Sequence, residues 1–381
     1  MSSPVEFMDL ENTVIKSKKI RIYPNAEQRN LLREWFGVAR FTYNKTIEYL
    51  KEPGTKANWK GIKTRIIRAL PEWAKKVPYQ IKSIAVRDAC KAVSNAKIEY
   101  KKTGVFQDVK FRSRKKKKQN VFVPQSAITR NSFYRTLMKE VKSSELFDRR
   151  KSKGSRVVLQ SGRYFIIIPN EVNIKYPENQ RIKLVALDPG VRTFQTFYSP
   201  VAMGKIGNLD FGKIQRLCLH LDNLISKISI AKARQKYRMK KAADRLRWKI
   251  KDLISEIHYK TANLLCKNFD VIALPPFEVS NMVSKLRSKT ARAMLTWSHY
   301  RFSQILKNKA KEYSVMIIRQ DEAYTSKTCN VCGQLNNVGS KSSFTCKCGI
   351  KHDRDYNSAR GIFLRALGDT PLLNENSVCI S

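Results

Sequence analysis

Four cysteines form the most specific chemical pattern in this chain. They stand as two pairs, Cys329 with Cys332 and Cys346 with Cys348, and a glycine follows each pair. Four thiolates in two closely spaced pairs favour one tetrahedral, structural zinc ion held in a zinc ribbon. The second pair encloses one residue where the first encloses two, so His352 stays open as a ligand in place of a cysteine.

Two acidic sites, far apart in the chain, could hold a different metal. Asp188 ends the apolar run 184–187 and precedes a Pro-Gly turn, whereas Asp355 stands at the start of a predicted amphipathic helix. A lone aspartate before Pro-Gly is often only a turn residue. A helix N-terminus, however, keeps a carboxylate ionised, as a metal ligand must be. A strand-end and a helix-start aspartate that converge would suit phosphodiester hydrolysis with two Mg²⁺ ions.

The charge of the chain indicates a polyanionic partner. Lys and Arg number 75 against 31 Asp and Glu, a net charge of +44 over 381 residues. Nucleic acid fits better than an anionic membrane, because no apolar run reaches membrane-spanning length and the basic residues are spread along the chain. A nuclear address or a solvated face is the alternative for each basic run. The side chains predicted to contact phosphates are Arg112, Arg114, Lys115, Lys116, Lys236, Arg238, Lys240 and Lys241.

The residue patterns predict a mixed α/β chain that carries these sites. Strands are expected at 16–24, at several places within 103–175, and at 184–187, 271–274 and 315–318; helices are expected within 25–102 and 211–269. Asn25 offers an N-cap to the first helix, with Gln28 three residues later. Cys90, Cys218 and Cys266 fall in helical segments, where small buried apolar residues are expected.

Several motifs resemble the TnpB family of transposon-encoded proteins. ALDPGVRTF, TSKTCNVCG and CGIKHDRDYN are similar to its RuvC-type nuclease core, and IRIYPNAEQ and FGVARFTYN to its first strand and recognition helices. MLTWSHYRFSQIL, DEAYTSKTC and ARGIFLRAL resemble the eukaryotic and viral branch called Fanzor. The resemblance covers nearly the whole chain. It implies a multidomain α/β fold with an RNase H-like (RuvC) nuclease domain split by a zinc ribbon, and an N-terminal β-barrel wedge domain split by helices.

The domain boundaries that the resemblance implies follow the residue patterns. The expected order is 1–25 wedge, first strand; 26–104 helical recognition domain; 105–180 wedge, remainder; 181–323 RuvC-like nuclease, first part; 324–352 zinc ribbon; and 353–381 RuvC-like nuclease, last part and C-terminal tail.

The resemblance also implies RNA-guided cleavage of DNA. The implied cofactors are two catalytic Mg²⁺ ions, one structural Zn²⁺ and a guide (omega) RNA. The partner is double-stranded DNA, with no membrane and no small-molecule cofactor, and the expected location is the nucleus. TnpB proteins carry a catalytic glutamate where this chain has Pro275. Fanzor proteins resemble this chain in that respect, which implies Glu322 as the third carboxylate beside Asp188 and Asp355, with Glu278 as its rival.

Two other functions remain open at this point. The missing glutamate at Pro275 would also fit a non-cleaving, RNA-guided or plain DNA-binding regulator or transposition accessory. An RNA-binding protein with a zinc ribbon would explain the charge but not the paired acidic motifs.

Overall fold

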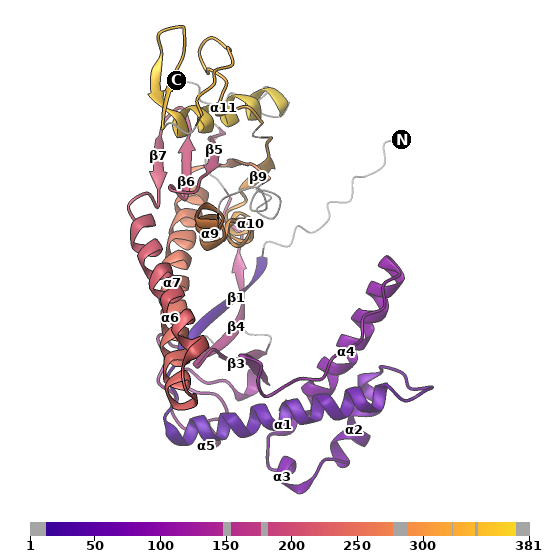
Figure 1. Ribbon diagram of the computed structural model, residues 1–381. Helices are drawn as coiled ribbons and strands as arrows, with labels where there is room; N and C mark the ends of the chain where they lie inside the picture. The colour runs from indigo at the N-terminus through magenta and orange to yellow at the C-terminus, as the bar shows by residue number, and fades with distance from the viewer. Residues whose placement is uncertain are drawn as a thin grey trace, which may run out of the picture. The chain divides into compact units, whose positions relative to one another are not determined.

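The computed structural model describes residues 13–147, 154–176, 182–276, 288–321, 323–339 and 342–370 (Figure 1). The chain divides into two compact units: an N-terminal unit, Ile15–Val172, and a C-terminal unit, Asn173–Ser381 with Met1–Val14. Among the described residues, no helix is both long and apolar enough to cross a bilayer.

The N-terminal unit is built on a four-stranded sheet with the strand order β1–β4–β3–β2. Its strands are β1 (Thr13–Ile22), β2 (Lys118–Val123), β3 (Ser155–Gln160) and β4 (Arg163–Asn173). Four helices come between β1 and β2, and two short ones between β2 and β3: α1 (Ala26–Leu50), α2 (Trp59–Arg68), α3 (Glu72–Lys75), α4 (Tyr79–Thr103), η1 (Gln125–Ala127) and α5 (Arg135–Met138). The helical block thus interrupts the strand-forming part of the chain, in the order that the residue patterns predict.

Local signals explain where the two long helices of this unit begin and end. Asn25 Oδ1 accepts a hydrogen bond from the Gln28 N–H at 2.8 Å, and Gln28 Oε1 accepts one from the Asn25 N–H at 2.9 Å. This capping box starts α1 at the predicted place. Gly104 ends α4 in a left-handed conformation, with φ of 69°, which a glycine adopts without a Cβ clash.

The C-terminal unit contains a five-stranded sheet with the strand order β7–β6–β5–β8–β9. The strands are β5 (Leu184–Pro189), β6 (Gln195–Tyr198), β7 (Met203–Ile206), β8 (Val271–Leu274) and β9 (Met316–Arg319). β7, β6 and β5 form an antiparallel meander, whereas β5, β8 and β9 run parallel. The parallel strands therefore end at the same edge of the sheet, as expected for a site built on strand ends.

Helices cover both faces of this sheet. The helices of the unit are α6 (Phe211–Ile230), α7 (Ala233–Asn268), α9 (Ser288–Trp297), α10 (His299–Tyr313) and α11 (Arg354–Asp369). Val185 and Leu187 of β5 join a core with α6, α7 and α10, whereas Leu184 and Ala186 join a second core with Ile362 of α11. Because side chains alternate along a strand, Asp188 shares a face with Leu184 and Ala186. Asp188 therefore lies on the side covered by α11 (yellow in Figure 1).

A small two-stranded sheet, β10 (Ser343–Thr345) with β11 (Lys351–Asp353), precedes α11. The long helical region predicted at 211–269 is present, with a break between α6 and α7 at residues 231–232. Cys90, Cys218 and Cys266 are free and buried, which confirms the prediction for these three cysteines.

Candidate functional site

The two aspartates predicted as Mg²⁺ ligands reach one end and one face of the C-terminal sheet. Asp188 lies opposite Thr196 of β6, and Thr196 lies opposite Lys205 of β7. Residues directly opposite one another on paired strands share a face. The Lys205 Nζ atom lies 2.8 Å from Asp353 Oδ2 and 3.1 Å from Asp355 Oδ2. Asp188, Thr196 and Lys205 thus form one row across the three strands. Through its contact with Asp355, Lys205 connects this row to the start of α11.

The first turn of α11 holds Asp355 in a defined backbone position. Asp353 is the N-cap, and its Oδ1 atom accepts hydrogen bonds from the N–H groups of Asp355 at 2.9 Å and Tyr356 at 3.4 Å. The positive end of the helix dipole favours an ionised carboxylate in this turn. The adjacent pair in the motif DRD therefore has two roles: Asp353 caps the helix, and Asp355 remains available as a ligand.

Lys205 is a residue that no sequence motif indicates. Burial alone would lower the pKa of its ammonium, but hydrogen bonds to Asp353 and Asp355, and their charges, outweigh burial and raise that pKa. Its side chain is 21% exposed, so the ammonium is only partly hydrated. The acidic site thus contains a positively charged side chain, the Lys205 ammonium.

The third predicted carboxylate remains a prediction. Glu322 and its rival Glu278 both lie outside the described residues. The parallel register pairs Ala186 with Ala273 and, extended by two residues, brings Pro275 beside Asp188. The resemblance to TnpB proteins implies a catalytic glutamate at position 275. This position therefore lies beside Asp188, and in this chain it carries no carboxylate.

The four cysteines predicted to bind zinc come together. Their Sγ atoms all lie within 4.8 Å of one another. Cys329 and Cys348 Sγ are 3.8 Å apart, and Cys332 and Cys346 Sγ are 3.5 Å apart. A tetrahedral zinc with Zn–S bonds of 2.3 Å needs sulfurs about 3.8 Å apart, so the set fits zinc. The N–H of Cys348 helps lower the pKa of the Cys346 thiol to about 6, which favours the thiolate that binds metal.

The glycines and His352 complete the geometry of this cluster. Gly333 and Gly349, which follow the cysteine pairs, have φ of 76° and 91°, so each chain segment turns where a side chain would be strained. His352 stacks on Phe344 with ring centroids 5.2 Å apart, and its Nε2 atom lies 2.8 Å from Asn357 Oδ1. These contacts favour four cysteine ligands over the alternative in which His352 replaces one.

The cysteine cluster and the acidic site share a support in Asn357. This residue of α11 is 1% exposed, and its Nδ2 atom donates to the carbonyls of Thr325 at 3.2 Å and Thr328 at 2.8 Å. In return, Asn330 Nδ2 donates to the Asn357 carbonyl. The segment that precedes and contains the first cysteine pair is therefore tied to the helix that positions Asp355.

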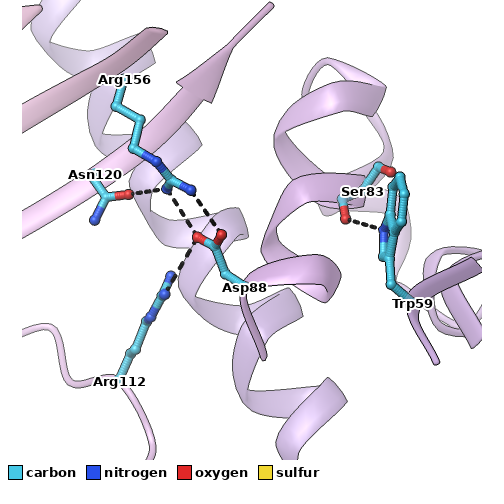
Figure 2. A network of polar contacts seen from close by, with 6 residues as sticks. All are labelled: Trp59, Ser83, Asp88, Arg112, Asn120 and Arg156. Carbon is cyan, nitrogen blue, oxygen red and sulfur yellow. Dashed lines mark hydrogen bonds and ion pairs between the residues drawn. The ribbon is translucent and has the colours of Figure 1, made fainter. Parts of the chain in front are cut away.

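Basic residues predicted to contact phosphates divide into tethered and exposed ones. In the N-terminal unit, the Nη2 atom of Arg112 lies 3.6 Å from Asp88 Oδ2 (Figure 2). The Arg112 guanidinium also lies 3.7 Å from the centre of the Tyr43 ring. Arg114, Lys115 and Lys116, which follow it, are exposed. Arg112 is thus held inside the unit, while its three neighbours face solvent.

The basic stretch at the start of α7 is mostly exposed as well. Arg238, Lys240 and Lys241 are exposed, whereas Lys236 is half-buried and donates to the Ser229 carbonyl at 3.4 Å. Lys241 also lies over the Tyr237 ring, 4.4 Å from its centre. The exposed members are accessible to a phosphate backbone.

The chain is similar to two known domain families and to several known proteins. Residues 299–362 match the family described as "Cas12f1-like, TNB domain", and residues 8–53 match one described as "Helix-turn-helix domain". A TnpB-like protein of Acanthamoeba polyphaga mimivirus is 25% identical over 382 residues, covering 91% of this chain and 72% of the relative. A putative RNA-guided DNA endonuclease of Streptomyces pristinaespiralis is 25% identical over 378 residues, covering 93% of this chain and 90% of the relative.

Among solved structures, the chain is similar to the protein of a Cas12f1–sgRNA–target DNA complex, with a TM-score of 0.54 and 13% identity over 92% of this chain and 99% of that one. The fold is therefore the mixed α/β fold of the Cas12f1 proteins. The chain is similar over 91% of its length to a protein named TnpB-like, which confirms the resemblance found in the sequence, and its giant-virus relatives fit the viral branch of the TnpB proteins.

Proposed function

We propose that this protein is an RNA-guided DNA endonuclease of the Fanzor branch. The observation that carries the proposal is that Lys205, which lies in the same cross-strand row as Asp188, contacts Asp355, 167 positions away from Asp188 in the sequence. A net charge of +44 and relatives named as RNA-guided DNA endonucleases support a nucleic-acid substrate.

The sheet supports an RNase H-like (RuvC) core. An antiparallel meander followed by two parallel strands carries Asp188 on its central strand, and α11 lies on the same face. In this proposal the domain boundaries expected from the sequence hold, with wedge and helical recognition domains in the N-terminal unit. The four cysteines bind one structural Zn²⁺ in a ribbon that steadies α11 through Asn357.

Asp188, Asp355 and Glu322 are the residues that would hold two Mg²⁺ ions. When bound, the metal supplies a nucleophilic water at neutral pH and offsets charge on the phosphate. The chain contributes position and charge. The strand ladder fixes Asp188, and the Asp353 cap holds the backbone of Asp355 at the start of α11. Glu322 follows Gln320 by two residues, and Gln320, the first residue after β9, is buried and donates a hydrogen bond to Asp369 of α11 at 2.6 Å.

The guide RNA would pair with the target strand, so base pairing would read the sequence and the protein would hold the backbone. Arg112 to Lys116 and the basic start of α7 are the proposed phosphate contacts. The protein would also read a short motif in double-stranded DNA next to the target. The nucleus is the proposed location, since the relatives include viruses of eukaryotic hosts.

A non-cleaving, RNA-guided DNA-binding protein is the second candidate. Pro275 favours it, because the register extended from β5 and β8 puts proline beside Asp188, where a carboxylate would complete the site.

A cleavage assay with Mg²⁺ and a matched guide separates the two candidates. Asp188→Ala, Glu322→Ala and Asp355→Ala should each abolish cleavage and leave RNA binding largely intact. Glu322→Gln should fail as fully as Glu322→Ala, because the site needs charge, whereas Glu278→Ala should keep most activity. If Glu278→Ala is inactive and Glu322→Ala cuts normally, the assignment of the third carboxylate is wrong. If the wild type cuts under no guide, the non-cleaving candidate replaces the nuclease.

A further inference from the structure

The N-terminal unit contains a small cationic pocket of about 180 Å³ between α1, the 112–116 segment and β2. No acidic side chain is among the described residues that line it. The charged and amide side chains that line the pocket are those of Arg40, Arg112, Lys116, Lys118, Gln119 and Asn120. They come from segments up to 80 positions apart in the sequence, so the pocket exists only in the folded chain.

Arg112 forms a fixed wall of this pocket. The Asn44 side chain makes two hydrogen bonds to the backbone of Arg112. Asn44 Oδ1 accepts one from the Arg112 N–H at 2.8 Å, and Asn44 Nδ2 donates one to the Arg112 carbonyl at 3.0 Å. The guanidinium lies against Tyr43 and within 3.6 Å of Asp88. A side chain held in this way loses little further freedom when it binds an anion.

Asn120 is oriented by a second arginine. Arg156 binds Asp88 through two hydrogen bonds, of 2.8 and 2.9 Å, and also donates to Asn120 Oδ1 at 2.6 Å. Because a guanidinium only donates, the accepting atom of Asn120 must be its oxygen. Figure 2 shows the Asn120 nitrogen pointing away from Arg156. The Nδ2 group has no partner among the described residues, so it is a donor available to a ligand in the pocket.

The charges around the pocket are unbalanced. Asp88 is the carboxylate that contacts Arg112, and both of its oxygens also accept hydrogen bonds from Arg156. Arg40 donates to Gln119 Oε1 at 2.9 Å, and burial, followed by the charge of Arg114, lowers the pKa of Arg40. A bound anion would offset this excess of positive charge. Two planar guanidinium groups with an amide donor match the tetrahedral oxygens of a phosphate.

We propose that this pocket is a phosphate-binding site that takes one backbone phosphodiester of a bound nucleic acid. Arg40 and Arg112 supply fixed donors, Asn120 supplies the amide N–H, and Lys116 and Lys118 close over the outer oxygens. The proposal rests on the proposed nucleic-acid function and adds the place where one phosphate is held. RNA and DNA both offer this phosphodiester, so the experiment has an arm for each.

The test compares Lys116→Gln with Lys110→Gln, which removes the same charge from an exposed residue that neither lines the pocket nor belongs to the proposed phosphate contacts. The probes are a single-stranded RNA and a DNA duplex, each of about 20 nucleotides or base pairs, and the measurement is the dissociation constant as a function of salt. Lys116→Gln should weaken binding of one of the two probes about tenfold and lower the salt slope for that probe by about 1, whereas Lys110→Gln should change binding less than twofold.

A double variant tests whether the pocket residues act on one phosphate. Arg40→Gln and Lys116→Gln together should weaken binding by clearly less than the product of their single effects, because both contact the same group. Thermal unfolding of each variant checks that the unit is folded. Equal effects of Lys116→Gln and Lys110→Gln on both probes would overturn the pocket while leaving nucleic-acid binding in place. Failure of the wild type to bind either probe would instead overturn the proposed function.

Discussion

Replacing Lys205 by methionine is expected to strengthen metal binding at the acidic site. The Lys205 ammonium contacts Asp355, the same carboxylate that we propose as a metal ligand. A divalent cation and the ammonium therefore compete for one carboxylate. Methionine keeps the length of the side chain and removes its charge, so Asp355 would be released without a large change in packing.

The magnitude follows from the exposure of the pair. Lys205 is 21% exposed and Asp355 is 42% exposed, with 3.1 Å between Nζ and Oδ2. A pair so close to solvent contributes about 1 kcal/mol. Release of Asp355 from this contact should therefore lower the dissociation constant for a divalent cation about fivefold.

Calorimetric titration of the guide-free protein with Mn²⁺ or Mg²⁺ measures this change. Lys249→Met, at an exposed position of α7, is the matched control and should leave the affinity unchanged. Asp355→Asn in the Lys205→Met background should abolish the gain in metal affinity, because the carboxylate for which the lysine and the metal compete is gone. Weaker metal binding in Lys205→Met would refute the reasoning and show that the lysine holds Asp355 in its binding position.

Three further predictions concern the zinc cluster, α7 and a buried histidine. Cys346→Ser should lose zinc and soluble yield together, since structural zinc binding is coupled to folding, and zinc-free soluble wild type would contradict this. Alanine at all four basic positions of α7 should weaken RNA binding and flatten its salt slope by about 3, whereas an unchanged slope would mean a merely solvated face; the positions are Lys236, Arg238, Lys240 and Lys241. Burial lowers the pKa of His258 to about 4, below its ordinary 6.5, so the unfolded chain binds the proton more readily. The stability that depends on a neutral His258 is fully present above pH 6.5 and is lost as the pH falls toward 4. His258→Gln should therefore reduce the change in melting temperature per pH unit between pH 5 and 6.5.

The features that the sequence predicts well are those encoded by neighbouring residues. The capping box of Asn25 and Gln28 depends on a four-residue segment, and the cysteine pairs with their glycines depend on local turns. The positions of Asp188 near the end of a strand and of Asp355 at the start of a helix are also predicted correctly, because each is recognisable from a short pattern. Their convergence needed only the expectation that strand ends gather on one rim.

The features that the sequence did not reveal depend on strand register and long-range pairing. Lys205 belongs to the acidic site only because β6 and β7 pair in a register that places it beside Asp353 and Asp355. Asp88 and Arg156, which form a pair 68 positions apart, likewise follow from packing of α4 on the sheet. Because the chain contains many lysines, the sequence alone does not distinguish Lys205 from the others.

Reprogramming the guide tests the central claim most directly. RNA that co-purifies with the protein is sequenced, the segment matching a DNA target is replaced by an unrelated sequence, and plasmids bearing the old and new targets are incubated with the complex and Mg²⁺. The account predicts that cleavage moves to the new target and is absent with Asp188→Ala or Asp355→Ala. Cleavage that stays at the old target, or that persists in both aspartate variants, would contradict it.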